Sequence, residues 1–152
     1  MDSVGDAPSI TPLKRIEHSK GLVMHAMKNS DLSYVGFGEA YFSGVNHNMC
    51  KGWKLHKKMT LNLIVPSGNI RFVVHGANQF SKAKTINPLI DTIIGESNYS
   101  RLTVPPGFWV AFQGIGLGQN ILLNIANLEH DPGEALNVDL NFFNVKGFVA
   151  HE

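Results

Sequence analysis

The apolar residues of this sequence come in short segments, and this feature most constrains the fold. The segments are rich in β-branched and aromatic residues, and Gly, Pro, Asn or Ser residues separate them. This pattern is typical of β-strands joined by turns. We therefore expect an all-β chain, and so many short strands favour a jelly-roll or a related closed barrel, which leaves few exposed edges. The expected strands are Gly21–Lys28, Glu39–Val45, Gly52–His56, Leu61–Val65, Ile70–His75, Leu89–Ile94, Arg101–Val104, Trp109–Gly114, Ile121–Ala126 and Leu136–Phe142.

Two turn sequences suggest how neighbouring strands are connected. Pro66-Ser67-Gly68-Asn69 separates LNLIV from IRFVV so tightly that an antiparallel hairpin is predicted. The segment QGIGLGQN contains Gly114, Gly116 and Gly118, but no helical pattern follows it, and its spacing differs from that of a dinucleotide-binding loop. We interpret this segment as a second hairpin loop between two barrel strands.

Composition narrows the class of protein. The chain has 152 residues, of which 43% are hydrophobic, and this fits one domain. We expect residues 1–20 to form an arm or an added edge strand and residues 21–152 to form the domain. The formal net charge of +1 provides no field that would recruit nucleic acid or an acidic membrane. The single cysteine permits no intrachain disulfide, and no signal peptide or run of about 20 apolar residues is present, so a cytoplasmic location is expected.

Three runs of residues resemble a known family. They are KGWKLHKKMTLNLIVPSGNIRFVV, RLTVPPGFWVAFQGIG and LLNIANLEHDPGEALNVD, which lie within residues 38–143. They are similar to the cupin-fold sugar-nucleotide enzymes, chiefly the dTDP-4-dehydrorhamnose 3,5-epimerases and the dTDP-sugar 3,4-ketoisomerases. The resemblance implies a cupin-type jelly-roll barrel (a double-stranded β-helix). It also implies a nucleotide-sugar substrate, a role in surface polysaccharide biosynthesis, and a homodimer.

The resemblance also assigns residues. The ketoisomerase run Arg-Gly-x-His-x-His-Lys aligns without a gap with residues 51–57, so its two histidine positions hold Lys54 and His56. The position of the epimerases' catalytic lysine is Leu61, and their catalytic tyrosine falls near Leu128 and Glu129. The sequence also ends before the segment that carries an aspartate partner of the histidine in those enzymes. The resemblance therefore implies the fold and the substrate class more strongly than 3,5-epimerisation.

His56 is the candidate catalytic base. An imidazole with a pKa near about 6.5 can remove a proton from the carbon next to a ketone if another group stabilises the enolate oxygen. Lys54 is the candidate for that second catalytic group, and Lys51 is a candidate for binding the substrate's diphosphate. If His56 faces inward, Lys54 shares its face, whereas Lys51 and Lys57 lie on the other face unless a bulge intervenes. The alternative is a solvated basic face with His56 pointing outward.

Three further residues are candidates for substrate binding, each beside a structural alternative. Arg71 could meet a diphosphate, or it could be a surface arginine whose stem covers apolar neighbours. Trp109 could stack on a base or a sugar ring, although core packing is more common for such a residue. His130 could act as the acid opposite His56, but Asp131-Pro132-Gly133 beside it is a strong turn signal.

No metal or other cofactor is expected. Metal-binding cupins present His-x-His, then a carboxylate, and later a third histidine. The corresponding positions hold Lys54, His56, Leu61 and Val110, so one donor remains of the several that a metal needs. The sequence therefore predicts a metal-free epimerase or ketoisomerase. A non-catalytic cupin that binds a sugar nucleotide or a glycan is the alternative.

Overall fold

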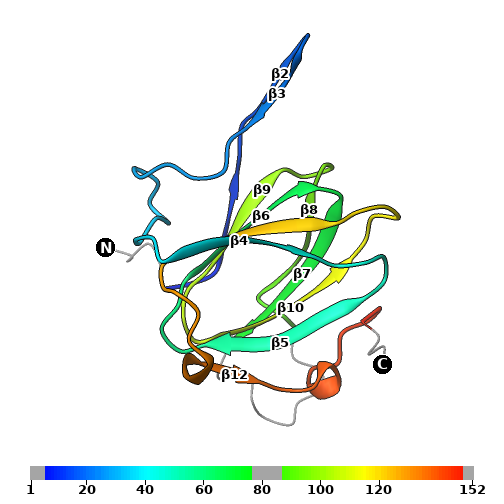
Figure 1. The fold of residues 1–152 in the computed structure, drawn as a ribbon. Coiled ribbons are helices and arrows are strands. Elements are labelled where there is room, and N and C mark those ends of the chain that lie inside the picture. Colours follow the sequence, from blue (N-terminus) through cyan, green and yellow to red (C-terminus); the bar gives the residue numbers. More distant parts are fainter. Residues whose placement is uncertain (1–5, 77–86, 149–152) are drawn as a thin grey trace.

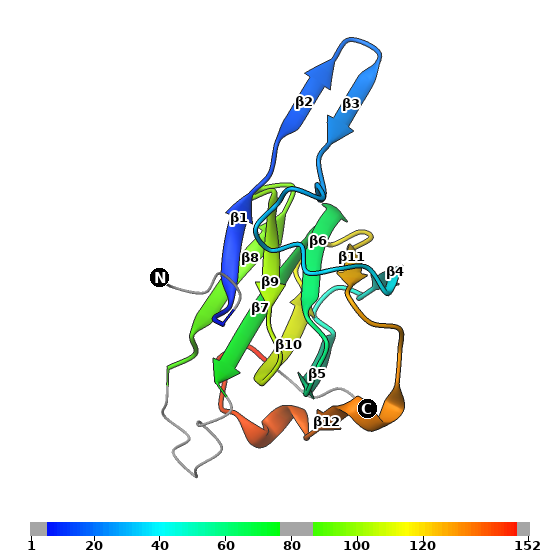
Figure 2. The ribbon, with the colours of Figure 1, turned by 90° about the vertical axis from the view of Figure 1, so that its left-hand side faces the viewer.

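The computed structural model describes residues 6–76 and 87–148 and shows an all-β jelly-roll, which confirms the expected fold class. Two five-stranded antiparallel sheets face one another (Figures 1 and 2). The first has the order β1-β9-β6-β11-β4 and the second β12-β5-β10-β7-β8. The strands are β1 (Ser9–Pro12), β2 (Arg15–His18), β3 (Gly21–Met24), β4 (Glu39–Gly44), β5 (Cys50–His56), β6 (Leu61–Ser67), β7 (Asn69–Gly76), β8 (Ile90–Gly95), β9 (Ser100–Val104), β10 (Phe108–Gly114), β11 (Ile121–Ala126) and β12 (Ala135–Asn137).

Apolar side chains fill two separate regions. The larger one lies between the sheets and includes Leu63, Phe72, Ile94 and Leu102. The smaller one lies on the outer face of the second sheet, where Trp53, Trp109 and their neighbours pack against Phe143. Strands β7 and β10 therefore bury side chains on both faces, which explains their nearly continuous apolar sequences.

The predicted hairpin between β6 and β7 is wrong. β6 pairs with β9 and β11, whereas β7 pairs with β10 and β8 in the other sheet. The tight turn instead carries the chain from one sheet to the other, because both strands are too apolar to leave a face in water. Gly68 adopts a φ of 79°, and a Cβ there would collide with the backbone of Gln119. The predicted hairpin in QGIGLGQN is wrong for the same reason, since it joins β10 and β11 of different sheets.

One buried amide ties these two crossings together. Asn120 is 1% exposed. Its Oδ1 accepts hydrogen bonds from the backbone N–H groups of Asn69 and Gly116, both at 3.0 Å. Its Nδ2 donates to the carbonyls of Val45, at 3.2 Å, and Gly116, at 2.9 Å. A single side chain therefore satisfies backbone groups that neither sheet can pair.

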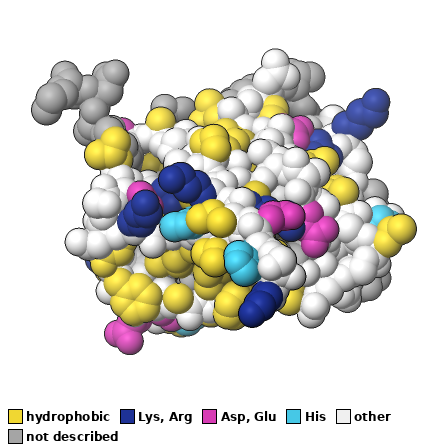
Figure 3. Space-filling model, turned by 90° about the horizontal axis from the view of Figure 1, so that it is seen from above, with side chains coloured by type: hydrophobic (Ala, Val, Ile, Leu, Met, Phe, Trp, Pro, Cys, Tyr) yellow, Lys and Arg dark blue, Asp and Glu magenta, His cyan; other side chains and the backbone are white. Residues whose placement is uncertain are grey.

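The N-terminal part contributes both an edge strand and a projecting hairpin. β1 pairs with β9 at the edge of the first sheet. Strands β2 and β3 pair only with each other and extend away from the barrel (Figures 1 and 2). Ile16, Leu22 and Val23 of this hairpin are about half exposed. In the view from above, hydrophobic side chains lie at the surface among charged ones (Figure 3).

The expected strand over residues 136–142 is confirmed only at its start. β12 covers Ala135–Asn137, and a short 3-10 helix, η3, follows at Leu140–Phe142. The chain leaves the sheet because Phe143 packs edge-on against Trp53, with ring centroids 4.7 Å apart. The Trp53 indole also donates a hydrogen bond to the Leu140 carbonyl at 3.0 Å. Across the described residues, no helix has the length and apolar character required to cross a membrane.

Replacing Asn120 with alanine should destabilise the barrel strongly. The change leaves several buried backbone groups without a partner, and each such group costs about 1–3 kcal/mol. We expect the free energy of unfolding, measured by urea denaturation, to fall by at least about 2 kcal/mol. Asn29→Ala, at an exposed loop position, is the matched control and should change it by less than about 0.5 kcal/mol. Equal stability of the two variants would contradict this account of the crossings.

Candidate active site

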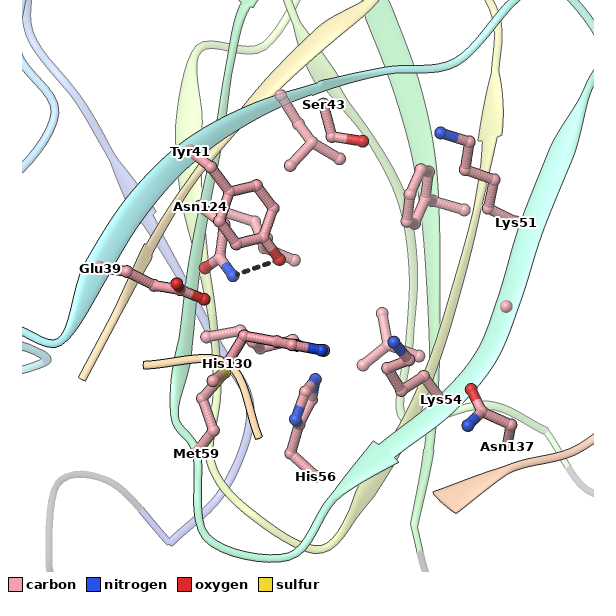
Figure 4. A pocket seen from close by; sticks show the side chains of 16 residues that line it. Glu39, Tyr41, Ser43, Lys51, Lys54, His56, Met59, Asn124, His130 and Asn137 are labelled. Atoms are coloured by element: carbon pink, nitrogen blue, oxygen red, sulfur yellow. Dashed lines mark hydrogen bonds between the residues drawn. The ribbon is translucent and has the colours of Figure 1, made fainter. Parts of the chain in front are cut away.

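A cavity of about 290 Å³ opens between the two sheets at β4, β5, β10 and β11 (Figure 4). Buried apolar side chains form its floor, and polar or charged side chains form its rim. The floor residues are Met59, Leu61, Leu63, Val110 and Leu122. The polar residues are Glu39, Tyr41, Ser43, Lys51, Lys54, His56, Asn124, His130 and Asn137.

His56 forms a pair with a buried carboxylate. His56 is the last residue of β5, and its Nδ1 hydrogen-bonds with Oε1 of Glu134. Glu134 ends the 3-10 helix η2 (Pro132–Glu134) and is 6% exposed. Its Oε2 accepts hydrogen bonds from the backbone N–H groups of Lys58, at 3.0 Å, and Met59, at 3.2 Å. The loop after β5 is thus folded around the carboxylate.

The charge of Glu134 determines which nitrogen of a neutral His56 ring carries the proton. Burial raises the pKa of Glu134, but the hydrogen bonds from His56, Lys58 and Met59 outweigh this effect, and the pKa is lowered overall. At neutral pH the carboxylate is therefore ionised and can only accept hydrogen bonds. Nδ1 of His56 must then carry the proton, which leaves Nε2 as the unprotonated atom of the neutral ring. His56 itself lines the cavity, and its hydrogen bond with Glu134 fixes the orientation of the ring there.

Sequence reasoning missed Glu134, because no local signal connects it with His56. The turn expected at Asp131-Pro132-Gly133 is present, and the Oδ1 atom of Asp131 accepts a hydrogen bond from the Gly133 N–H at 3.0 Å. The next residue, Glu134, lies 78 positions after His56. Only the pairing of β12 with the end of β5, in which Ala135 opposes His56, brings the two together.

Both candidate lysines of β5 line the cavity. Lys54 shares the face of His56, as the alternation of the strand predicts. Lys51 also lies there, because the pairing of β5 with β10 shifts between Lys54 and Lys51 and so places one extra residue in β5. The extra residue is a β-bulge at Gly52, which has a φ of 128° and where a Cβ would collide with Ala111. The side chain of Lys51 donates a hydrogen bond to the Gly44 carbonyl at 2.6 Å.

The other three candidates divide between the cavity and the opposite face of the second sheet. His130 lines the cavity and points toward His56 in Figure 4. Arg71 does not; it pairs with Asp91 at 2.8 Å and donates to the Lys146 carbonyl at 2.7 Å. Trp109 is fully buried in the outer cluster. Arg71 and Trp109 therefore hold the C-terminal segment in place, and the structure gives them no contact with the cavity.

Two further polar residues at the cavity had no motif to reveal them. Tyr41, on the edge strand β4, directs its hydroxyl into the cavity (Figure 4). Asn124, on β11, donates a hydrogen bond from Nδ2 to this hydroxyl at 3.1 Å. Each looks like an ordinary strand residue in the sequence. Whether these two side chains reach the cavity depends on which face of β4 and of β11 points into the barrel.

The donor set of the cavity does not fit a metal ion. Of the four positions that would bind one in a cupin, Lys54, Leu61 and Val110 have no metal-binding group available at neutral pH. Among residues 6–76 and 87–148, no group of three His, Cys, Asp or Glu side chains is placed to hold a metal.

Comparison with known proteins supports the class that the fold and the cavity suggest. No protein-family model matches the sequence, and no curated protein does. Solved structures do match. A dTDP sugar isomerase from Desulfovibrio desulfuricans is 26% identical with a TM-score of 0.82, and the match covers 97% of this chain and 94% of that one.

Two epimerases share the fold at lower identity. A dTDP-4-dehydrorhamnose 3,5-epimerase from Sulfolobus tokodaii is 17% identical, with a TM-score of 0.76 over 99% of this chain and 89% of that one. An epimerase from Legionella pneumophila, solved with dTDP-4-keto-L-rhamnose, is 13% identical, with a TM-score of 0.76 over 96% of this chain and 81% of that one. The resemblance to sugar-nucleotide epimerases and isomerases is thus confirmed, and these neighbours support an isomerase.

The His56–Glu134 pair should make the stability of the protein depend on acid pH. The folded-state pKa of Glu134 is lowered, so its stabilising effect is complete above the unfolded value of about 4.3 and is lost as the pH falls through the folded value. At pH 7 we expect Glu134→Gln to lower the free energy of unfolding by about 1.5–3 kcal/mol. In urea titrations at a series of pH values, this difference should shrink below about pH 4.3.

The exposed carboxylate Glu129, on the same segment, provides the matched control. Glu129→Gln should leave the free energy of unfolding within about 0.5 kcal/mol of the wild-type value. A Glu134→Gln penalty that stays constant from neutral to acid pH would contradict the lowered pKa.

Proposed function

We propose that this protein is an isomerase of a nucleotide-activated 4-keto-6-deoxyhexose and that His56 removes a proton from a carbon next to the keto group. The observation that carries the proposal is the His56–Glu134 pair at the cavity, because the carboxylate engages Nδ1 and so makes Nε2 the proton acceptor when the ring is neutral. The reaction is an epimerisation or a ketoisomerisation and needs no metal.

The chemistry follows from the acidity of the substrate. The carbon–hydrogen bond next to the ketone breaks, its proton goes to Nε2 of His56, and its electron pair forms the carbon–carbon double bond of an enolate. The negative charge moves to the former keto oxygen. Return of a proton to the other face of the same carbon inverts its configuration. Return to the former keto carbon, with the proton of the adjacent hydroxyl passing to the former keto oxygen, moves the ketone along the ring instead.

Cationic side chains near His56 can stabilise the enolate and bind the diphosphate. Lys54 and Lys51 share the cavity with His56, and an ammonium acts as a point charge that needs no fixed bidentate geometry. We assign Lys54, two residues before His56 on the same face, to the developing oxyanion. We assign Lys51, near the end of β4, to the diphosphate. His130 also lines the cavity beside His56, so we assign it as a second group that can exchange a proton with the substrate (Figure 4).

The size and lining of the cavity fit the sugar part of the substrate. A volume of about 290 Å³ lies just below the range of about 300–1,000 Å³ for ligand pockets. The cavity therefore takes the hexose, and the nucleotide extends over the rim. The apolar floor around Leu61 and Leu122 suits the methyl group of a 6-deoxy sugar better than a hydroxymethyl group.

One position favours the ketoisomerase or the single-carbon epimerase over the 3,5-epimerase. Leu61 lines the cavity where the resemblance places the epimerases' catalytic lysine, and leucine cannot exchange a proton. A cytoplasmic location and a place in surface polysaccharide biosynthesis stay predictions from the sequence and the resemblance.

Deuterium exchange tests the proposed reaction. The protein is incubated in D₂O with dTDP-4-keto-6-deoxyglucose, and with the UDP, GDP and CDP analogues, and exchange at the third and fifth ring carbons is followed by NMR. Exchange at the third carbon alone would identify a ketoisomerase or 3-epimerase, and exchange at both carbons a 3,5-epimerase. His56→Asn should lower the rate by about 10²–10⁴-fold, the usual effect of removing a general base.

Matched variants separate catalysis from folding and binding. His47→Asn, at an exposed position outside the cavity, should exchange at the wild-type rate. Lys54→Met should weaken both nucleotide-sugar binding and exchange, whereas Lys57→Met, exposed in the next loop, should affect neither. Wild-type protein that shows no exchange with any of the four substrates would overturn the enzymatic proposal in favour of sugar-nucleotide or glycan binding.

We also propose that the protein is a homodimer joined through the β2–β3 hairpin. An isolated two-stranded hairpin is marginally stable in water. Among the described strands, this hairpin pairs with no other, and it exposes Ile16 and Val23, which oppose one another across its two strands. A neighbouring copy would cover this apolar face. The resemblance to the epimerase family supports the same assembly.

Light scattering at micromolar concentration should give twice the mass of the chain. Replacing both Ile16 and Val23 with lysine should shift the mass toward that of a monomer, because it places charges on the face that the partner copy would cover. Glu17→Lys, on the other face of the hairpin, should leave the dimer intact. A wild-type monomer, or equal effects of the two changes, would contradict a dimer built through this face.

A further inference from the structure

Tyr41 places a hydroxyl group in the same cavity as His56, and a buried polar network holds it there. Asn124, 1% exposed, donates from Nδ2 to the Tyr41 Oη at 3.1 Å (Figure 4). The Oδ1 atom of Asn124 accepts from the backbone N–H of Asn62 at 3.3 Å. The side chain of Asn62, 4% exposed, in turn accepts from the Thr103 hydroxyl at 2.6 Å and donates to the Ser33 carbonyl at 3.2 Å.

The backbone contact fixes the orientation of the Asn124 amide. A backbone N–H can only donate, so the atom of Asn124 that faces Asn62 must be the carbonyl oxygen. The amide nitrogen then faces Tyr41. That nitrogen can only donate, so the Tyr41 oxygen is the acceptor of this hydrogen bond.

This direction decides where the Tyr41 proton can go. A tyrosine hydroxyl has one proton, and Asn124 cannot accept it. Within residues 6–76 and 87–148, no group accepts a hydrogen bond from this hydroxyl, which points into the cavity (Figure 4). The proton is therefore available to an oxygen atom of a molecule bound in the cavity.

We propose that Asn124 is a positioning residue that commits the Tyr41 hydroxyl to donate a hydrogen bond to the substrate's keto oxygen. This inference rests on the proposed function. When His56 takes the proton from carbon, negative charge develops on that oxygen, and a hydrogen-bond donor already aimed at it stabilises the enolate without reorganising. The tyrosine proton stays on Tyr41, so the step is balanced by the transfer to His56 alone.

Asn124→Asp tests the direction of the hydrogen bond with little change in shape. The carboxylate still accepts from the Asn62 N–H, but it also accepts from the Tyr41 hydroxyl and so turns the proton away from the cavity. Asn127→Asp is the matched control, because Asn127 follows β11 and its Oδ1 likewise accepts from a backbone N–H, that of Thr60 at 2.8 Å, without lining the cavity. The Asn127→Asp variant introduces the same negative charge three residues further along the chain.

The first readout is the deuterium exchange rate at saturating sugar nucleotide. Tyr41→Phe should lower this rate by about 10²–10³-fold, as loss of an oxyanion donor does. Asn124→Asp should lose most of the same factor, with the half-saturating concentration changed less than about two-fold, and Asn127→Asp should retain the wild-type rate. The double variant Asn124→Asp/Tyr41→Phe should be no slower than Tyr41→Phe. Losses that multiply in the double variant, or an equal loss in Asn127→Asp, would overturn the inference.

The second readout does not depend on activity. The chain has three tyrosines, so ¹³Cζ-labelled tyrosine gives a simple NMR spectrum in which Tyr41→Phe identifies the Tyr41 signal. That signal should shift in Asn124→Asp, because the hydroxyl changes from acceptor to donor, and should stay in place in Asn127→Asp. An unchanged signal in Asn124→Asp would overturn the inference even in an active enzyme. Lack of exchange in the wild type would instead overturn the proposed function and the catalytic role of Tyr41 with it.

Discussion

Strand β5 has two faces of opposite character, and burial of its apolar face determines the site. Trp53 and Leu55 pack into the outer cluster under the C-terminal segment, while Lys54 and His56 face the cavity. Because side chains alternate along a strand, burial of the two apolar residues fixes the two polar ones inside. The bulge at Gly52 then adds Lys51 to the same face. The orientation of His56 thus depends on the C-terminal segment that packs on Trp53, although this segment lies on the other side of the sheet.

The sequence predicted the strands well because their signal is local. Alternation and turn residues located most of the strands to within a few residues, and the resemblance pointed to His56. Sheet pairing was predicted badly, because a tight turn such as that at Gly68 fits both a hairpin and a crossing between sheets. Which of the two forms depends on the strands with which β6 and β7 pair, and those partners come from distant parts of the sequence.

The same limit explains which site residues could be found. Lys54 and His56 share a short motif on one strand, so their common face could be predicted. Glu134 and Tyr41 come from distant segments, and Lys51 depends on a bulge that the pairing with β10 creates. Arg71 and Trp109 were plausible ligands from residue type alone. Their strands bury both faces, and residue type could not tell the outer face from the inner one.

Asn120 serves the stability of the barrel, whereas the buried polar residues beside the cavity, Glu134 and Asn124, also fit a functional role. A buried polar group contributes little net stability even when its hydrogen bonds are complete, and an apolar residue would fill the same space at lower cost. Glu134 and Asn124 nevertheless occupy such positions, and each directs one atom of a second residue toward the cavity. In the mechanism that we propose, Glu134 makes Nε2 of His56 the proton acceptor, and Asn124 leaves the Tyr41 hydroxyl to donate a hydrogen bond. An acceptor and a donor held in one cavity are what the formation of an enolate requires, since the carbon loses a proton while the oxygen gains charge.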